Sequence, residues 1–531
     1  MLPPELVLYC WPFVAFVVFF RVRPAIALPA AIIAGYLFLP PRVVIDFPLI
    51  PELDKNSVSA ITGAILGLYF VLVRRMSATA PSDGAGGPRA TEDMLPNWVP
   101  RHPMAFFLLA MLAIAPIITV LTNGDTIRVG AATLPGLRLY DAGSMGLEVL
   151  VALIPFFLAR RFLYSAEHHR LLLIVLAVAG AIYAIPALYE VRMSPQLNRI
   201  VYGFFQHSWI QHIRGEGFRP LVFLQHGIWL GIFLCMALLA AFTCVRSMTS
   251  SWRYLMLPIG VYILATLVLA KSLGALLIAM VLIPVVLLSP KRVQLLTAAG
   301  IAVLAIGYPY MRSIDIAPVD QVVELAERID ADRAQSFQFR LDNEDILLAK
   351  ARERMLAGWG GWGRGRVVDD DGNDISVTDG YWIITFGQGG IMRYVGEFGL
   401  LTMAIFVLAL RPSRHRTTIA TTGVALALSA NLVDLLPNAS ISPVTWLLAG
   451  ALLGRIEAWK YEETSPATAV PDLDDTTLRR RRQKGTAAPA PVPAGSPPVI
   501  AGDGDVVVAM PSAQPRNRHS RFATKHVRQK I

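Results

Sequence analysis

Residues 221–244 read LVFLQHGIWLGIFLCMALLAAFTC, and this stretch decides the class of fold. It is apolar almost throughout, with Gln225 and His226 near its start, and it contains no Asp, Glu, Lys or Arg. A bilayer core about 30 Å thick is crossed by a helix of about 20 apolar residues. The stretch therefore predicts a helix that spans a membrane.

Runs of the same character recur along the chain. They cover residues 6–20, 25–39, 58–73, 104–121, 145–158, 171–189, 221–244, 254–270, 274–288, 295–310, 391–410, 419–436 and 444–453. We therefore expect an all-α, polytopic membrane bundle of about 12–13 transmembrane helices over residues 1–457. The composition agrees, because 16% of the residues are charged, against about 25% in soluble domains.

The charged residues predict the orientation of the bundle. Lys and Arg gather in alternate connecting segments, which the positive-inside rule places in the cytoplasm. The intervening segments are acidic or uncharged, so we expect them to face outward, together with the N-terminus. The pattern leaves one large outward loop over residues 311–390, with short helices over 319–329 and 335–356. It also leaves a disordered, basic cytoplasmic tail over residues 458–531. The net charge of +10 fits such a topology and does not indicate nucleic-acid binding.

Two local motifs resemble a dinucleotide site and a metal site, but neither is expected to bind a cofactor. Residues 358–363 read GWGGWG, yet a dinucleotide site also requires a preceding strand. We expect a flexible loop whose Trp359 and Trp362 stack on sugar rings or, alternatively, anchor the loop among lipid headgroups. The histidines His207, His212 and His226 lack regular metal-ligand spacing, so no metal is expected. For His226 we expect a hydrogen-bonding or proton-handling role at the membrane surface.

The outward-facing cations are the most informative set of candidate site residues. Arg214 and Arg219 precede the span at 221–244, Lys271 lies in the next outward turn, and Arg340 lies in the large loop. Arg binds phosphate oxygens in a bidentate manner, whereas Lys binds them as a point charge. If these side chains converge, they form a site for an anionic group at the outer interface. The alternative is that they contact lipid headgroups individually.

Four stretches of the sequence resemble segments of a known protein family. They are residues 214–230 (RGEGFRPLVFLQHGIWL), 271–277 (KSLGALL), 339–365 (FRLDNEDILLAKARERMLAGWGGWGRG) and 379–400 (DGYWIITFGQGGIMRYVGEFGL). In order and spacing the chain resembles the O-antigen ligase and Wzy polymerase superfamily of membrane glycosyltransferases. Two positions depart from the family pattern. Leu273 stands where the family's turn usually carries Arg, and Asp379 stands where ligases tend to show His, which favours a polymerase.

The resemblance implies a bacterial inner-membrane enzyme. It would transfer a glycan from an undecaprenyl-diphosphate-linked donor to a glycan or lipid acceptor, without a nucleotide sugar or a metal, and alongside polysaccharide assembly proteins. The residues placed on the diphosphate are Arg214, Arg219 and Lys271. Arg340 would assist from the loop, and His226 or Asp379 would accept the proton of the acceptor hydroxyl.

Two interpretations from other functional classes stay open. One is a transporter or flippase for a lipid-linked or anionic solute, which would place ionisable residues near the membrane midplane. The other is a non-catalytic partner in polysaccharide export.

Overall fold

The computed structural model describes residues 1–20, 22–47, 50–78, 94–129, 132–214, 217–329, 331–369, 371, 373–410 and 417–462. All of them belong to the unit Met1–Asp472. Most of the tail predicted over 458–531 lies outside the described residues, and so does the side chain of Arg214. Residues 458–462 are not part of a disordered tail, because they continue the last helix.

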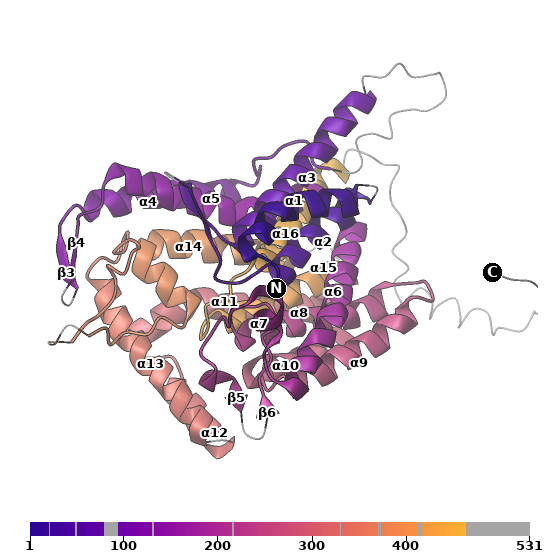
Figure 1. The fold of residues 1–531 in the computed structure, drawn as a ribbon. Coiled ribbons are helices and arrows are strands. Elements are labelled where there is room, and N and C mark those ends of the chain that lie inside the picture. Colours follow the sequence, from indigo (N-terminus) through magenta and orange to yellow (C-terminus); the bar gives the residue numbers. More distant parts are fainter. Residues whose placement is uncertain are drawn as a thin grey trace, which may run out of the picture. The chain divides into compact units, whose positions relative to one another are not determined.

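The described part of the chain is mostly helical, as predicted, with three short hairpins (Figure 1). In chain order the elements are α1 (Pro4–Phe19), α2 (Pro24–Phe38), β1 (Ile45–Phe47), β2 (Ile50–Leu53), α3 (Lys55–Ala78), α4 (Pro103–Thr122), β3 (Ile127–Val129), β4 (Ala132–Leu134), α5 (Leu139–Phe162), α6 (Ala166–Met193), α7 (Leu197–Tyr202), η2 (Ile210–His212), β5 (Ile213–Arg214), β6 (Gly217–Phe218), α8 (Gly227–Ser247), α9 (Arg253–Leu269), α10 (Leu273–Leu288), α11 (Lys291–Ser313), α12 (Val319–Ile329), α13 (Ala331–Arg352), α14 (Tyr381–Leu410), α15 (Ile419–Asp434) and α16 (Pro443–Glu462).

Each apolar run predicted as a span contains a helix, but the stretch at 221–244 is helical only from Gly227 onward. The reason is a set of side-chain contacts that hold residues 221–223 in a non-helical conformation. Glu190 accepts hydrogen bonds from the backbone N–H groups of Leu221 and Val222, and Lys55 donates to the carbonyl of Phe223. Hydropathy alone could not reveal these contacts, because they come from residues far away in the sequence.

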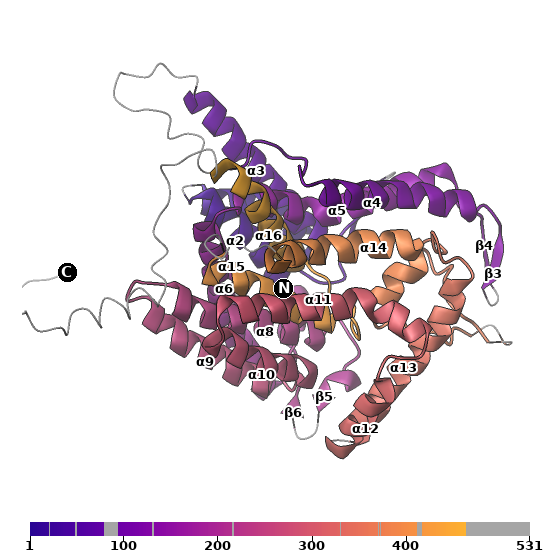
Figure 2. The same cartoon turned by 180° about the vertical axis from the view of Figure 1, so that it is seen from behind.

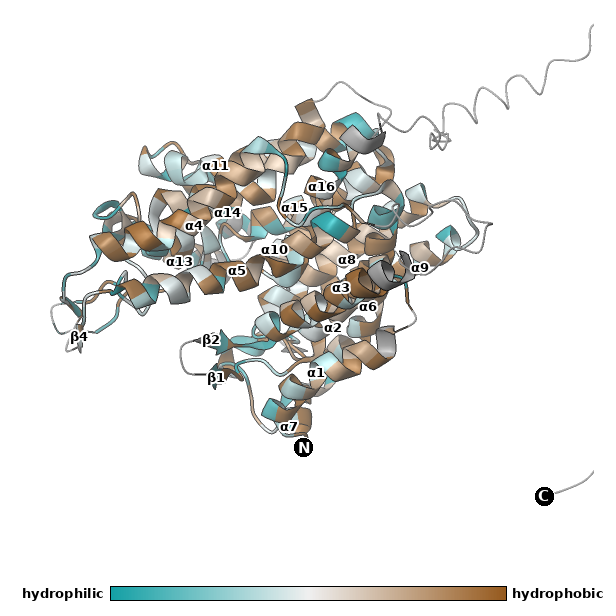
Figure 3. Ribbon diagram, turned by 90° about the horizontal axis from the view of Figure 1, so that it is seen from above, coloured by the Kyte–Doolittle hydropathy of each residue, from teal (hydrophilic) through white to brown (hydrophobic). Residues whose placement is uncertain are grey.

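Several helices are suited to a lipid environment. Seven of the described helices are long and apolar enough to cross a membrane, and further apolar helices of 10–17 residues accompany them. Large apolar side chains remain exposed on the helix surfaces, for example Phe13 and Val17 on α1 and Leu121 on α4. Figure 3 shows that hydrophobic residues dominate helices such as α3 and α5. The structure thus supports a multi-pass membrane protein, while the count of 12–13 spans stays a prediction.

The centre of the described unit is formed by α8, α15 and α16, whose side chains are almost all buried. Helix α16 packs closely on α5, because Gly450 and Gly454 face the backbone of α5 without an intervening side chain. Small residues at such interfaces let helices of membrane proteins approach one another closely. Figures 1 and 2 show α15 and α16 among the surrounding helices from opposite sides.

Hydrogen bonds join helix ends and connecting segments in two sets, while the predicted sidedness stays a prediction. In the outward segments and at the outward ends of the predicted spans, the paired residues are Leu2–Val201, Lys55–Phe223, Thr119–Ala357 and Tyr381–Leu435. Among those expected inside they are Leu95–Arg161, Arg101–Glu457 and Arg246–Ser289. Each set of contacts joins segments that were predicted to lie on one side.

The large loop contains the two predicted helices, but it is shorter than predicted. Helix α12 covers the expected segment 319–329, α13 starts earlier than expected and ends at Arg352 rather than at residue 356, and α14 begins at Tyr381 rather than near residue 391. Helix α14 continues across a kink at Gly390, whose φ of 63° and ψ of −163° are accessible essentially only to glycine. A side chain at Gly390 would also overlap the backbone of Leu356. The kink therefore lets the glycine-rich turn after α13 lie directly against α14.

Candidate functional site

Arg219 directly follows the β5–β6 hairpin, and neighbouring residues hold its side chain in place. Its side chain is 8% exposed, and Nη2 donates to Oγ of Ser272 over 3.1 Å. The Ser272 hydroxyl in turn donates to the carbonyl of Gly227 over 3.3 Å. A Cβ at position 227 would lie 2.7 Å from Nε of Arg219, so glycine makes room for the guanidinium at the start of α8.

Lys271 lies in the tight turn between α9 and α10, next to Ser272. Its backbone has a φ of +54°, a left-handed conformation that turns the chain sharply. A Cβ at Gly217 would lie 2.8 Å from the Lys271 ammonium, so the β5–β6 hairpin approaches this lysine closely. The predicted cations Arg219 and Lys271 come from segments far apart in the sequence, and both lie near the β5–β6 hairpin, Arg219 directly after it and Lys271 against Gly217. Arg214 ends β5, and its side chain lies outside the described part of the structure.

His226 is the N-cap of α8, since its Nδ1 accepts a hydrogen bond from the backbone N–H of Ile228 over 3.1 Å. Burial, reinforced by the nearby charge of Arg219, lowers the pKa of His226 to about 2. The imidazole is therefore neutral at physiological pH. His226 thus makes a hydrogen bond within the protein, whereas its expected hydrogen-bonding or proton-handling role at the membrane surface stays a prediction.

Arg340 on α13 pairs with Asp379, just before α14, with Nε and Oδ2 3.3 Å apart. The charge of Arg340 also acts on His226 and, together with Arg219, on Asp434 at the end of α15. The large loop therefore brings its cation to the same region as the α8 N-terminus. Arg340 thus pairs with Asp379, while Arg219 lies beside Ser272, the neighbour of Lys271, and its charge acts on His226.

The two predicted tryptophans differ in their surroundings. Trp359 is 6% exposed, its indole N–H donates to the carbonyl of Lys350, and its ring lies 3.8 Å from the Lys350 ammonium and 4.3 Å from the Arg354 guanidinium. In this conformation the ring of Trp359 packs within the protein rather than offering a surface to a sugar. Trp362 is 57% exposed and lines a large cavity.

That cavity has a volume of about 1010 Å³ and lies among α3, α5, α14 and α16. Its wall includes Trp362, Tyr381, Glu148 and the ion pair of Arg393 with Glu397, in which Nε and Oε1 are 2.8 Å apart. Gln225, which directly precedes His226, also lines it. The cavity therefore reaches from the glycine-rich loop to the neighbourhood of the α8 N-terminus.

Sequence reasoning missed two residues that build the site. Ser272 positions Arg219, and Glu190 fixes the non-helical segment before His226. Ser272 lies inside the quoted stretch 271–277, so its place beside Lys271 was a usable signal. Glu190 offered none, because the backbone groups of Leu221 and Val222 that it binds are distant in the sequence.

The arrangement can bind an anionic group and stabilise negative charge, since fixed guanidinium and ammonium groups act strongly where water is excluded. The Asp379 carboxylate, paired with Arg340, belongs to a residue type that can accept a proton. Comparisons of the chain with protein-family models, with curated proteins and with solved structures gave no match.

Proposed function

We propose that this protein is a membrane glycosyltransferase that polymerises or ligates glycan units from an undecaprenyl-diphosphate-linked donor, with polymerisation favoured. One observation carries the proposal: buried Arg219 is bonded to Ser272 beside Lys271 and its charge acts on His226, on which the charge of Arg340 also acts. A donor with a lipid tail and a charged diphosphate requires both an apolar surface and fixed cations in one place.

The reaction assigns a role to each group. The bond between the anomeric carbon and the diphosphate oxygen breaks, and a bond from that carbon to the acceptor oxygen forms. Arg219 and Lys271 stabilise the charge that develops on the departing diphosphate. Removing one such donor typically costs about 10²–10³ in rate.

The acceptor hydroxyl must also lose its proton, and we assign this role to Asp379 rather than His226. The Nδ1 lone pair of His226 is engaged by the N–H of Ile228, and the low pKa of this imidazole makes it a weak base. Asp379 is 37% exposed at its carboxylate and is oriented by Arg340. A carboxylate held in this way can accept a proton from a bound hydroxyl.

The cavity beside the site suits a carbohydrate. An exposed indole such as Trp362 can stack on a sugar ring, and the charged lining supplies hydrogen-bond partners for hydroxyl groups. We assign the acceptor glycan to this cavity. The protein is then placed in a bacterial inner membrane with about 12–13 spans, the site on the periplasmic side and the C-terminus in the cytoplasm.

The test is the profile of lipid-linked glycans after deletion of the gene. Accumulation of single units on undecaprenyl diphosphate is expected for a polymerase, and long chains stranded on the same lipid would indicate a ligase instead. Complementation with Arg219→Ala at normal membrane abundance should fail, whereas Arg128→Ala, at an exposed arginine on β3, should restore assembly. Full activity of Arg219→Ala would refute the diphosphate role.

One observation favours a second candidate, a transporter or flippase for a lipid-linked or anionic solute. Arg393, Glu397 and Glu148 line the cavity from helices that are apolar enough to span a membrane, and ionisable residues in such helices often mark transport pathways. An unchanged glycan profile in the deletion strain would favour this transport function or a role as a non-catalytic partner in polysaccharide export.

A further inference from the structure

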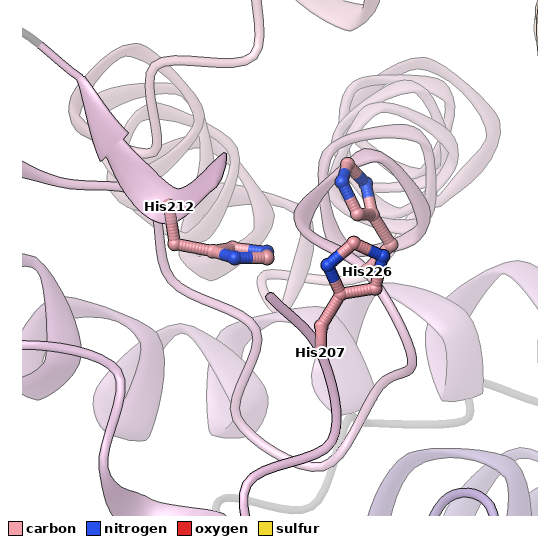
Figure 4. Close-up of side chains that lie close together, drawn as sticks. All are labelled: His207, His212 and His226. Carbon is pink, nitrogen blue, oxygen red and sulfur yellow. The ribbon is translucent and has the colours of Figure 1, made fainter. Parts of the chain in front are cut away.

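Three histidines converge near the start of α8, although each belongs to a different segment of the chain (Figure 4). His207 follows α7, His212 ends the 3-10 helix η2, and His226 caps α8. Their ring centroids are 4.7 Å apart for His207 and His226, 5.1 Å for His212 and His226, and 5.2 Å for His207 and His212. One nitrogen from each ring lies within 4.8 Å of the other two.

We propose that His207, His212 and His226 form a binding site for a transition-metal ion of the zinc class. Zn²⁺ binds imidazole nitrogen at about 2.0–2.1 Å, which places tetrahedral ligand atoms about 3.4 Å apart. The separations need to shrink by at most about 1.5 Å, which rotations of the three side chains provide. Imidazole ligands favour Zn²⁺, Cu²⁺ or Ni²⁺, whereas Mg²⁺ and Ca²⁺ prefer oxygen.

The hydrogen bonds define which nitrogen each ring can offer. His212 Nδ1 lies 2.9 Å from the carbonyl oxygen of Ser208. A carbonyl only accepts, so Nδ1 carries the proton and Nε2 holds the lone pair. Metal-binding histidines usually have such a backbone partner on the second nitrogen, which fixes the tautomer and the ring orientation. His212 is therefore the best-prepared ligand of the three.

His207 and His226 complete the site in different ways. His207 is partly exposed and offers one ring nitrogen within 4.8 Å of those of the other two histidines. His226 uses its Nδ1 lone pair to cap α8, and joining a metal requires it to give up that hydrogen bond to Ile228. We therefore assign His207 and His212 as the principal ligands and His226 as the third.

The surrounding charges set the character of the site. Arg219 and Arg340 act on His226, and Arg42 acts on His207, so the local potential opposes a dication. A site with three protein ligands keeps a fourth position for water or an anion, as catalytic rather than structural zinc sites do. An anionic fourth ligand offsets the repulsion from the arginines. The site should thus select a metal that binds nitrogen strongly and reject Mg²⁺.

The experiment uses the full chain purified in detergent through a tag without histidine and stripped with EDTA. Zn²⁺ binding is measured by titration calorimetry, and Co²⁺ binding by its visible absorption. We expect one strong Zn²⁺ site per chain and no Mg²⁺ binding. His207→Ala and His212→Ala should each weaken Zn²⁺ binding at least about tenfold. His168→Ala, on α6 away from the cluster, should bind Zn²⁺ as the wild type does.

Folding of each variant is checked by size-exclusion chromatography and thermal unfolding. If an alanine variant misfolds, His207→Gln provides the same test at a partly exposed position. Absence of strong Zn²⁺ binding to the wild type, or unchanged binding in the folded variants, would overturn the proposal. The readout is metal binding itself, so the result does not depend on whether the protein transfers glycans.

Discussion

The kink at Gly390 offers a sharp test of how the large loop is held against the helices. Replacing this glycine by alanine forces a residue with a Cβ into φ 63° and ψ −163°, at a cost of about 1–3 kcal/mol. The new methyl group also overlaps the backbone of Leu356, and overpacking adds about 1–3 kcal/mol. We therefore expect Gly390→Ala to lose about 2–6 kcal/mol of stability.

The assay is the apparent midpoint of thermal unfolding of the purified protein in detergent, compared at one heating rate. At about 2 °C per kcal/mol the expected loss lowers the midpoint by about 4–12 °C. The matched control is Gly387→Ala, three residues earlier on the same helix, where a Cβ meets nothing within 4 Å. This control should be neutral or stabilising, because alanine is the better helix former. Equal midpoints for Gly390→Ala and the wild type would refute the reasoning.

Three further predictions concern packing, pH and chemistry. Gly450→Ala should lower the unfolding midpoint, because the new methyl group overlaps the α5 backbone. Gly300→Ala, where the new methyl group meets open space on α11, should leave the midpoint unchanged. Similar shifts in both variants would contradict the close packing of α16 on α5. Burial raises the pKa of the Glu344 carboxyl above 4.5, so ionising this group costs folded-state stability as the pH rises beyond that value. The unfolding midpoint of Glu344→Gln should therefore rise relative to that of the wild type between pH 4.5 and 8. A difference between the two midpoints that stays constant with pH would argue against this. Asp379→Asn should abolish glycan assembly in a complementation assay. His226→Asn keeps a side-chain oxygen that can cap the helix, so this variant should retain glycan assembly. Loss of assembly in His226→Asn and not in Asp379→Asn would exchange the proposed roles of the two residues.

The helices could be predicted from the sequence because hydropathy is a local property. The runs at 104–121 and 171–189 both appear as helices, and the two amphipathic segments of the large loop appear as α12 and α13. Two of the boundaries that were wrong have different causes. Helix α8 starts late because Glu190 and Lys55 hold the preceding backbone, and α14 starts early because Gly390 permits a kink instead of a break.

The candidate site was predictable in its residue types and not in its geometry. The cations Arg219 and Lys271 stood out because they lie beside apolar runs on the side predicted to be outside. The three histidines were noted, but a metal site was not expected, since the spacing from His207 to His212 and on to His226 follows no helix or hairpin rule. Only the hairpin β5–β6 and the non-helical segment before α8 bring the three rings together.

The surroundings of Arg219 distinguish between the two interpretations that its sequence position allowed. An arginine that serves only lipid headgroups extends along the surface and keeps its guanidinium in water. Arg219 is instead buried, bonded to Ser272, and given space by a glycine at position 227. Holding a buried cation in one place costs desolvation, and the cost is offset when an anion binds there. A preorganised cation of this kind stabilises charge that develops during a reaction without first having to reorient. The burial of Arg219 therefore favours a role towards a specific anionic group over general attachment to the membrane.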